Sequence, residues 1–273
     1  MKAPIFEIRF IYMTLHAIQS SSVNYDSIKK IAREYSTLDY FSSLANLLKN
    51  IYPTEVFTEY SKKSLHQKIN DVLLHHYKGE YELKYILSKL FFNKNLVAAF
   101  EMRVNKSRAD FLTVNGVSKS FEIKSELDNL DKLQKQSSDY GMVFDYNYLV
   151  VDPKHINKAL DIIPESFGVW SFSNGKKQIR RNATLNASID PEMQLKLLTK
   201  KELSTWFSEE RGEIKQILKS KSPLEINYLF KKTLKERYRI RWEFLVRHQE
   251  SILPIDIQFF FNTNINPEFI YRN

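Results

Sequence analysis

Residues 110–124 of the chain read DFLTVNGVSKSFEIK. Two runs rich in strand-forming residues, Asp110–Val114 and Val117–Lys124, flank the dipeptide Asn115-Gly116. An Asn-Gly dipeptide between two such runs is a strong signal for a β-hairpin. The stretch therefore predicts two neighbouring antiparallel strands, and it also carries the charged residues from which a chemical site could be built.

The length of the hairpin loop decides whether the acidic residues of the two strands share a face. A strict two-residue turn would put Asp110 and Glu122 on opposite faces of the sheet. A three-residue loop, 114–116, forms a bulged hairpin in which Asp110 faces Ser120 and Glu122 is its diagonal neighbour on the same face. We predict the bulged form, because only then could both carboxylates reach one cation.

Apolar periodicity predicts the elements around this hairpin. From Glu80 onward the order is helix, strand, strand, strand, helix, strand, which is typical of a mixed α/β sandwich. Besides the hairpin, the expected elements are a helix from Glu80 to Phe91, a strand at Val97–Val104, a helix at Asp128–Tyr140 capped by Asp128, and strands at Tyr148–Val151 and Phe167–Phe172.

The flanking regions read differently, so we divide the chain into three parts. Residues 1–62 form a helical N-terminal region, 63–175 the α/β core and 176–273 a basic helical C-terminal region. Within the last part we expect a polar basic loop at Lys176–Arg181 and a long helix at Ile226–Gln249. The aromatic-rich tail from Pro254 is expected to pack over the core without regular secondary structure.

The composition excludes several classes of protein. The chain lacks cysteine, which excludes disulfide frameworks and thiol nucleophiles and fits a reducing cytoplasm. It has six glycines and no Gly-rich phosphate loop, which argues against Rossmann and P-loop sites. No stretch approaches the roughly 20 apolar residues that cross a membrane. Charged residues interrupt Met1–Gln19, so we expect no signal peptide, no membrane partner and a cytoplasmic location.

The basic excess favours a polyanionic partner. The net charge is +9 and the pI about 9.3, which favours nucleic acid over a membrane surface. Between Arg211 and Arg247, eleven Lys or Arg residues stand against four Glu. Among them, Lys231, Lys235 and Arg239 recur at i, i+4 spacing, which predicts a basic ridge on one helix, although a solvated helix face would look the same. The predicted nucleic-acid-binding residues are Arg108 and, on this helix, Lys231, Lys235, Arg239 and Arg241.

The charged residues of the hairpin suit phosphodiester hydrolysis. That reaction needs an activated water and neutralised phosphate charge, and a divalent cation held by oxygen ligands supplies both. Asp110 and Glu122 would supply carboxylates, and Ile123 a backbone carbonyl oxygen. Lys124 follows on the same strand face as Glu122, where its ammonium can orient water and stabilise developing charge.

Residues outside the hairpin complete the candidate site. Glu80 lies at the edge of the buried face in the first turn of its helix, where it could take a second metal ion or an outer-shell water. The helix dipole alone could also explain an acid there. Gln136 and Tyr140 are one helical turn apart and project from one face. They would line the groove and hold a substrate phosphate or the lysine.

Taken together, these residues resemble the PD-(D/E)XK nuclease superfamily. The resemblance covers about residues 78–152, and the Gln-x-x-x-Tyr element is similar to that of the RecB-like and lambda-exonuclease-like branches. It implies a restriction-endonuclease-like fold with an αβββαβ core and Mg²⁺- or Mn²⁺-dependent cleavage of DNA. It also implies metal ligation by Asp110 and Glu122, with Lys124 as the catalytic lysine. One departure is that Ala109 stands where the motif's name has proline.

Two alternatives remain beside a metal-dependent deoxyribonuclease. One is a catalytically silent protein on the same fold that binds nucleic acid or a protein partner, and the other is a nuclease directed at RNA. Every catalytic position holds a competent residue, which favours an enzyme. A homodimer or a protein partner is left open. A bacterial or phage origin and a role in defence are suggested by analogy alone.

Overall fold

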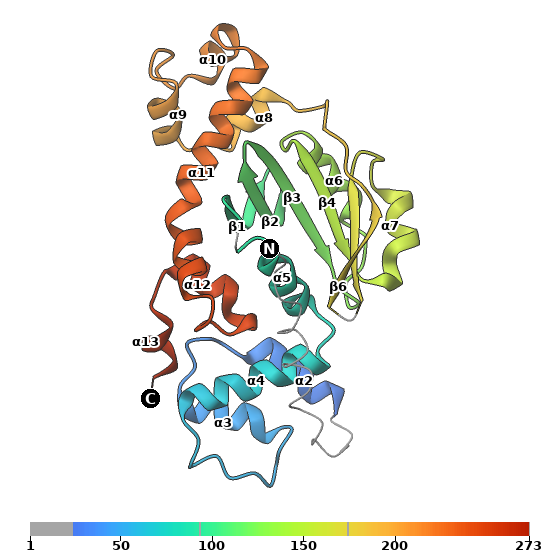
Figure 1. Ribbon diagram of the computed structural model, residues 1–273, viewed down its shortest axis with the longest axis vertical. Helices are drawn as coiled ribbons and strands as arrows, with labels where there is room; N and C mark the ends of the chain where they lie inside the picture. The colour runs from blue at the N-terminus through green and yellow to red at the C-terminus, as the bar shows by residue number, and fades with distance from the viewer. Residues whose placement is uncertain (1–23, 93, 174, 273) are drawn as a thin grey trace, which may run out of the picture.

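The computed structural model describes residues 24–92, 94–173 and 175–272, so the expectation for Met1–Gln19 lies outside the described residues (Figure 1). The first described elements are helical, as predicted. Their apolar faces form a second, smaller core, which includes Ile31, Leu48 and Leu73 and also Ile255 from the C-terminal region. These helices are α2 (Tyr25–Glu34), α3 (Phe41–Lys49) and α4 (Lys62–His76).

A mixed sheet of six strands forms the centre of the structure, in the order β1-β2-β3-β4-β5-β6. The β1, β2 and β3 strands are antiparallel, β3, β4 and β5 run parallel, and β6 is antiparallel to β5. The predicted mixed α/β class is therefore confirmed. The strands are β1 (Val97–Val104), β2 (Ser107–Asn115), β3 (Val117–Lys124), β4 (Tyr146–Val151), β5 (Gly168–Ser173) and β6 (Lys176–Arg181).

Helices pack on both faces of the sheet. On one face, α5 (Glu80–Lys89) and α11 (Pro223–His248) contact the antiparallel strands, and Trp242 of α11 packs against Phe111 of β2. On the other face lies α6 (Leu133–Gly141), which connects β3 to β4 and contacts β2 and β4. The next crossover, from β4 to β5, contains α7 (Ile156–Ile162). Figure 1 shows α11 and α6 on either side of the sheet.

The predicted bulged hairpin is wrong. Asn115 pairs with Val117 around Gly116, whose φ is 71°, and Leu112 rather than Asp110 faces Ser120. This tighter register pairs Phe111 with Phe121, and both rings then pack with Phe91 in one buried cluster. Continued by one pair, the same register sets Asp110 opposite Glu122. Because strand side chains alternate, the two acids still share a face, as the prediction required.

Three other expectations need correction. Lys176–Arg181 is not a loop but β6, an edge strand whose basic side chains are mostly exposed, which is how natural edges avoid pairing with other chains. The helix expected from Asp128 begins at Leu133, since Asp128 instead accepts a 2.7 Å hydrogen bond from the Ser125 amide. The tail is helical rather than irregular. It contains η2 (Pro254–Asp256), α12 (Ile257–Thr263) and α13 (Pro267–Tyr271).

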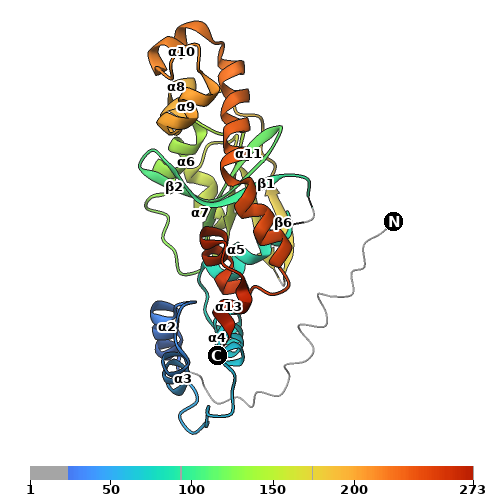
Figure 2. The ribbon, with the colours of Figure 1, turned by 90° about the vertical axis from the view of Figure 1, so that its left-hand side faces the viewer.

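The long helix predicted in the C-terminal region is confirmed as α11. Ser222 and Glu225 form a capping box at its start, and Leu234, Tyr238 and Leu245 on its core-facing side are buried. In Figures 1 and 2, α11 runs along the sheet from the α8–α10 end to α12. The helices not yet named are η1 (Pro153–His155), α8 (Pro191–Lys196), α9 (Lys200–Trp206) and α10 (Ile214–Ser220).

Within the described ranges, no helix combines the length and the apolar character needed to span a membrane.

Candidate active site

Two carboxylates meet at the open end of the β2–β3 hairpin. Asp110 is partly exposed, and its Oδ2 accepts a 2.6 Å hydrogen bond from the Ile123 amide. This bond brings Asp110 beside the residue whose carbonyl was predicted as a third metal ligand. Glu122 is only 2% exposed. The hairpin thus places one acid at the rim of the site and one inside it.

Three predicted residues contact Glu122, and two of them, Gln136 and Tyr140, were expected to hold a substrate phosphate or the lysine instead. Lys124 is 8% exposed and its Nζ lies 2.7 Å from Glu122 Oε1. Gln136 donates a hydrogen bond to the same oxygen. The Tyr140 hydroxyl lies 2.7 Å from Glu122 Oε2 and 2.8 Å from the carbonyl oxygen of Arg108. The one-turn spacing of Gln136 and Tyr140 on α6 therefore serves to hold this carboxylate from one side.

Burial makes this pair of acids costly to ionise in the absence of a cation. Desolvation, followed by the charge of Glu122, raises the pKa of Asp110 well above its usual value. Desolvation also raises the pKa of Glu122, against the opposing effects of Lys124, Tyr140 and Gln136. Burial and the Glu122 carboxylate raise the pKa of Tyr140, so its hydroxyl keeps its proton and serves as a donor. A bound cation would therefore favour the ionised forms of both acids.

The contact between Tyr140 and Glu122 gives a stability prediction. Replacing Tyr140 with phenylalanine is expected to destabilise the fold by about 1–2 kcal/mol, because buried Oε2 of Glu122 loses its donor and little volume changes. The matched control is Tyr228→Phe, since Tyr228 is 63% exposed and should change stability by less than about 0.5 kcal/mol. Urea denaturation of both variants measures the difference. A Tyr140→Phe variant as stable as the wild type would mean that the Tyr140 hydroxyl contributes nothing to stability.

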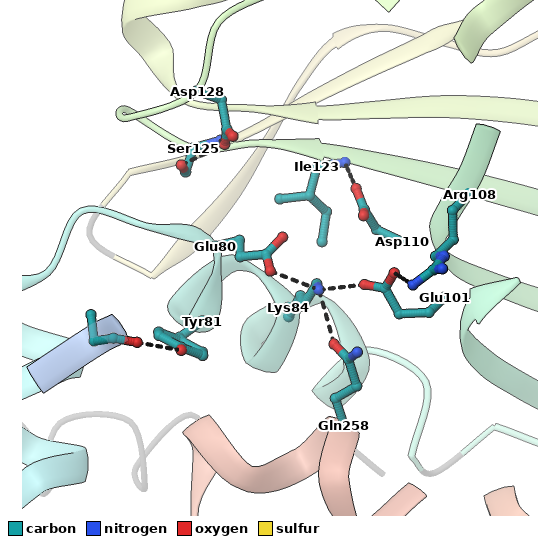
Figure 3. A network of polar contacts seen from close by, with 11 residues as sticks. Glu80, Tyr81, Lys84, Glu101, Arg108, Asp110, Ile123, Ser125, Asp128 and Gln258 are labelled. Atoms are coloured by element: carbon teal, nitrogen blue, oxygen red, sulfur yellow. Dashed lines mark hydrogen bonds and ion pairs between the residues drawn. The ribbon is translucent and has the colours of Figure 1, made fainter. Parts of the chain in front are cut away.

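Glu80 contacts a buried lysine, Lys84, that lies near Asp110 (Figure 3). Lys84, one turn along α5, is 4% exposed and its Nζ lies 2.9 Å from Glu80 Oε1. The same nitrogen lies 2.7 Å from Glu101 Oε1 and 2.9 Å from Gln258 Oε1. The structure thus brings Glu80 to the site as predicted, but with Lys84 as its partner.

Sequence reasoning missed Lys84, Glu101 and Gln258. Two signals were present. Lys84 follows Glu80 by four residues on the same helix, and Glu101 interrupts the apolar run of β1. Gln258 had no local signal, because it comes from α12, 174 residues after Lys84.

The residues of the hairpin fit a hard divalent cation. Among the described side chains, no group of three or more His, Cys, Asp or Glu is arranged to hold a metal ion. Mg²⁺ does not need three such side chains, because it keeps several of its waters and binds through one or two carboxylates. Asp110 and Glu122 offer those carboxylates, and a cation would offset their repulsion. In addition, Oε1 of Gln136 is buried without a hydrogen-bond partner in the described structure, so it could accept from a metal-bound water.

The predicted nucleic-acid-binding residues fall into two groups. Arg108 is exposed beside the site and lies 3.7 Å from Glu101. On α11, Lys235, Arg239 and Arg241 are exposed. Lys231 is largely buried, with its Nζ 3.2 Å from the buried Asp145. Lys231 therefore ties α11 to the sheet and is less available for phosphate contact than predicted.

Comparisons with known proteins extend over most of the chain but name no activity. A family model described as "Bacteriophage P4 protein cII" matches residues 75–260. A solved structure, the SPO1766 protein of unknown function from Silicibacter pomeroyi, is 17% identical and aligns with a TM-score of 0.33 over 50% of this chain and 89% of its own. A similarity this low carries no argument about fold or function. Among curated proteins, none matches this chain.

Proposed function

The chain belongs to the bacteriophage P4 protein cII family, and we propose that it is a metal-dependent nuclease that hydrolyses DNA. In this proposal residues 78–152 form a PD-(D/E)XK site on a restriction-endonuclease-like core. Mg²⁺ or Mn²⁺ is the cofactor. The bacteriophage protein named in the family's description is compatible with the phage or bacterial origin expected from the sequence.

One observation carries the proposal. The Lys124 ammonium lies 2.7 Å from the buried Glu122 carboxylate, and the hairpin register sets Asp110 across from Glu122. Two acids and a lysine that lie so close together are rarely an arrangement for stability, because the carboxylates repel each other and the burial of Glu122 costs desolvation energy. Groups with perturbed pKa values that converge in this way are typical of functional sites.

The residues of the chain have distinct tasks in this mechanism. A divalent ion bound by Asp110 and Glu122 would lower the pKa of an attacking water and neutralise charge on the phosphate. Lys124 stabilises negative charge that develops on the phosphate oxygens. Gln136 and Tyr140 fix the Glu122 carboxylate through their hydrogen bonds, so that it does not reorient between turnovers.

A second candidate function is a silent binding protein on the same fold. Glu122 favours it, because this residue is 2% exposed and both of its carboxylate oxygens already accept hydrogen bonds from protein donors. In that case the polar cluster would serve stability, and the exposed cations would bind nucleic acid without cutting it.

A cleavage assay separates these functions. Purified protein is incubated with supercoiled plasmid, linear single-stranded DNA and RNA, each with Mg²⁺, with Mn²⁺ and with EDTA. We expect DNA cleavage that EDTA abolishes. Cleavage of RNA alone would redirect the proposal to an RNA nuclease. Salt-sensitive binding without cleavage of any substrate would favour the binding protein.

The exposed cations of α11 give a prediction about binding. Replacing Lys235 and Arg239 together with alanine should make the dependence of log K on log salt shallower by about 1.8 for duplex DNA, since each phosphate contact contributes about 0.9. Fluorescence anisotropy over a range of salt concentrations measures the slope. Lys231→Ala is the control, and it should lower thermal stability through Asp145 with little change in slope. An unchanged slope in the double variant would make this surface a solvated helix face.

A further inference from the structure

The ammonium of Lys84 is held like a ligand-bound cation. It has three N–H donors, and oxygens of Glu80, Glu101 and Gln258 lie 2.9, 2.7 and 2.9 Å from it. These oxygens come from three separate elements, α5, β1 and α12 (Figure 3). All donors of this nearly inaccessible lysine are therefore satisfied by a surrounding shell of oxygen atoms.

The backbone of β1 is distorted where it contributes to this shell. Glu101 has a φ of 56°, in the left-handed region that a residue with a side chain rarely adopts. The β1–β2 ladder pairs Phe100 with Phe111 and Met102 with Ala109, but it omits Glu101 and the opposite residue, Asp110. The strand thus gives up regular pairing at the position where Glu101 meets Lys84, directly across from the candidate metal ligand. Local strain of this kind concentrates at functional sites.

The charges of this region favour one divalent ion over two. Four carboxylates lie here, Glu80 and Glu101 around Lys84, and Asp110 and Glu122 on the hairpin. Two buried ammonium groups, Lys84 and Lys124, face them, and the exposed Arg108 lies 3.7 Å from Glu101. At most two negative charges are left over, so one divalent ion is enough to neutralise them. A second divalent ion would make the cluster positive and would have to displace Lys84 from Glu80 and Glu101.

We propose that Lys84 is a built-in cation of the site. It fills the place beside Asp110 that a second divalent ion would need, and so limits the site to a single divalent ion. Glu80 and Glu101 then act as anchors of Lys84 and not as metal ligands. Gln258 makes α12 part of the same shell, so the C-terminal region helps to set the metal content. This inference rests on the proposed function, because it assumes that Asp110 and Glu122 bind a metal ion.

Counting bound Mn²⁺ tests this proposal without any cleavage assay. Mn²⁺ is added stepwise to the metal-free wild type, Lys84→Gln and Lys84→Met. Electron paramagnetic resonance measures the Mn²⁺ that stays free at each step, and the difference gives the number of ions bound per chain. We expect one ion per wild-type chain and two per chain in each Lys84 variant. Lys68→Gln is the matched control, because it removes a partly buried lysine from Glu55, at 2.9 Å, in the helical region, and should leave the count at one.

Each result has a separate meaning. Two ions in the wild type, or one ion in a folded Lys84 variant, would overturn the role of Lys84, and metal-dependent cleavage could still stand. No ion in the wild type would remove both this proposal and the proposed metal-dependent function. Circular dichroism reports whether the Lys84 variants fold. If neither folds, the wild-type count at saturation decides, with one ion supporting the proposal and two overturning it.

Discussion

Replacing Lys124 with alanine is expected to lower the rate of metal-dependent DNA cleavage by about two to three orders of magnitude, with DNA affinity changed by no more than about twofold. The side chain is 11% exposed, so it has little contact with bulk solvent and its ammonium acts at short range. Its position 2.7 Å from Glu122 puts it where charge would develop on a bound phosphate. Single-turnover cleavage at saturating Mg²⁺ measures the loss, and fluorescence anisotropy in Ca²⁺ measures affinity.

Two further variants separate the charge of Lys124 from its contribution to folding. Lys124→Gln can still donate a hydrogen bond to Glu122, so it should fold well and yet remain inactive. Lys119→Ala is the positional control, because Lys119 lies on the same strand but on the opposite face, near the Tyr146 ring. It should cleave at the wild-type rate. Cleavage by Lys124→Ala at that rate would show that the lysine assignment is wrong.

The hairpin was predictable because its signals are local. Asn115-Gly116 between two strand-forming runs defines a turn without reference to the rest of the chain. Its register was not predictable in the same way, because a contact with a third element, Phe91 just after α5, accompanies the pairing of Phe111 with Phe121. The shared face of Asp110 and Glu122 followed correctly only because the two registers differ by an even number of residues.

The site was predictable as far as its parts lie on the hairpin and on one helix. Gln136 and Tyr140 reach Glu122 because an i, i+4 pair projects from one face of a helix, a relation that spacing alone gives. The shell around Lys84 depends on the docking of α12, which brings in Gln258 from far along the chain. No periodicity encodes such a contact.

The misassigned C-terminal elements have the same physical origin. Lysine and arginine are poor strand formers in isolation, so Lys176–Arg181 resembled a loop. Pairing with β5 supplies the hydrogen bonds that make it a strand, and Lys177 packs over the ring of Trp170. In the tail, Phe260 and Phe261 are fully buried, and this burial stabilises a helix as short as α12.

Asp110→Asn is expected to be more stable than the wild type in EDTA and less stable than the wild type in Mg²⁺. Burial and the charge of Glu122 raise the pKa of Asp110 in the folded protein. The stability contributed by such a carboxyl group is complete below its unfolded pKa of about 4 and is lost as pH rises through the folded pKa. At neutral pH in EDTA, the asparagine variant should therefore be more stable than the wild type by about 1–2 kcal/mol, with a flatter pH profile above about pH 4. Its amide oxygen can still accept from Ile123.

Added Mg²⁺ should make the wild type more stable than Asp110→Asn. At a hundred times its Kd, the ion would stabilise the wild type by about 2.7 kcal/mol and the variant by much less, because one ligand has lost its charge. Asp139→Asn is the control. Burial opposes ionisation of Asp139, but hydrogen bonds from Lys135, Ser107 and Asn105 outweigh it and lower its pKa, so that variant should lose stability at neutral pH with or without Mg²⁺. Thermal unfolding in EDTA and in Mg²⁺ measures all three proteins. If Mg²⁺ stabilises Asp110→Asn as much as the wild type, Asp110 is not a metal ligand.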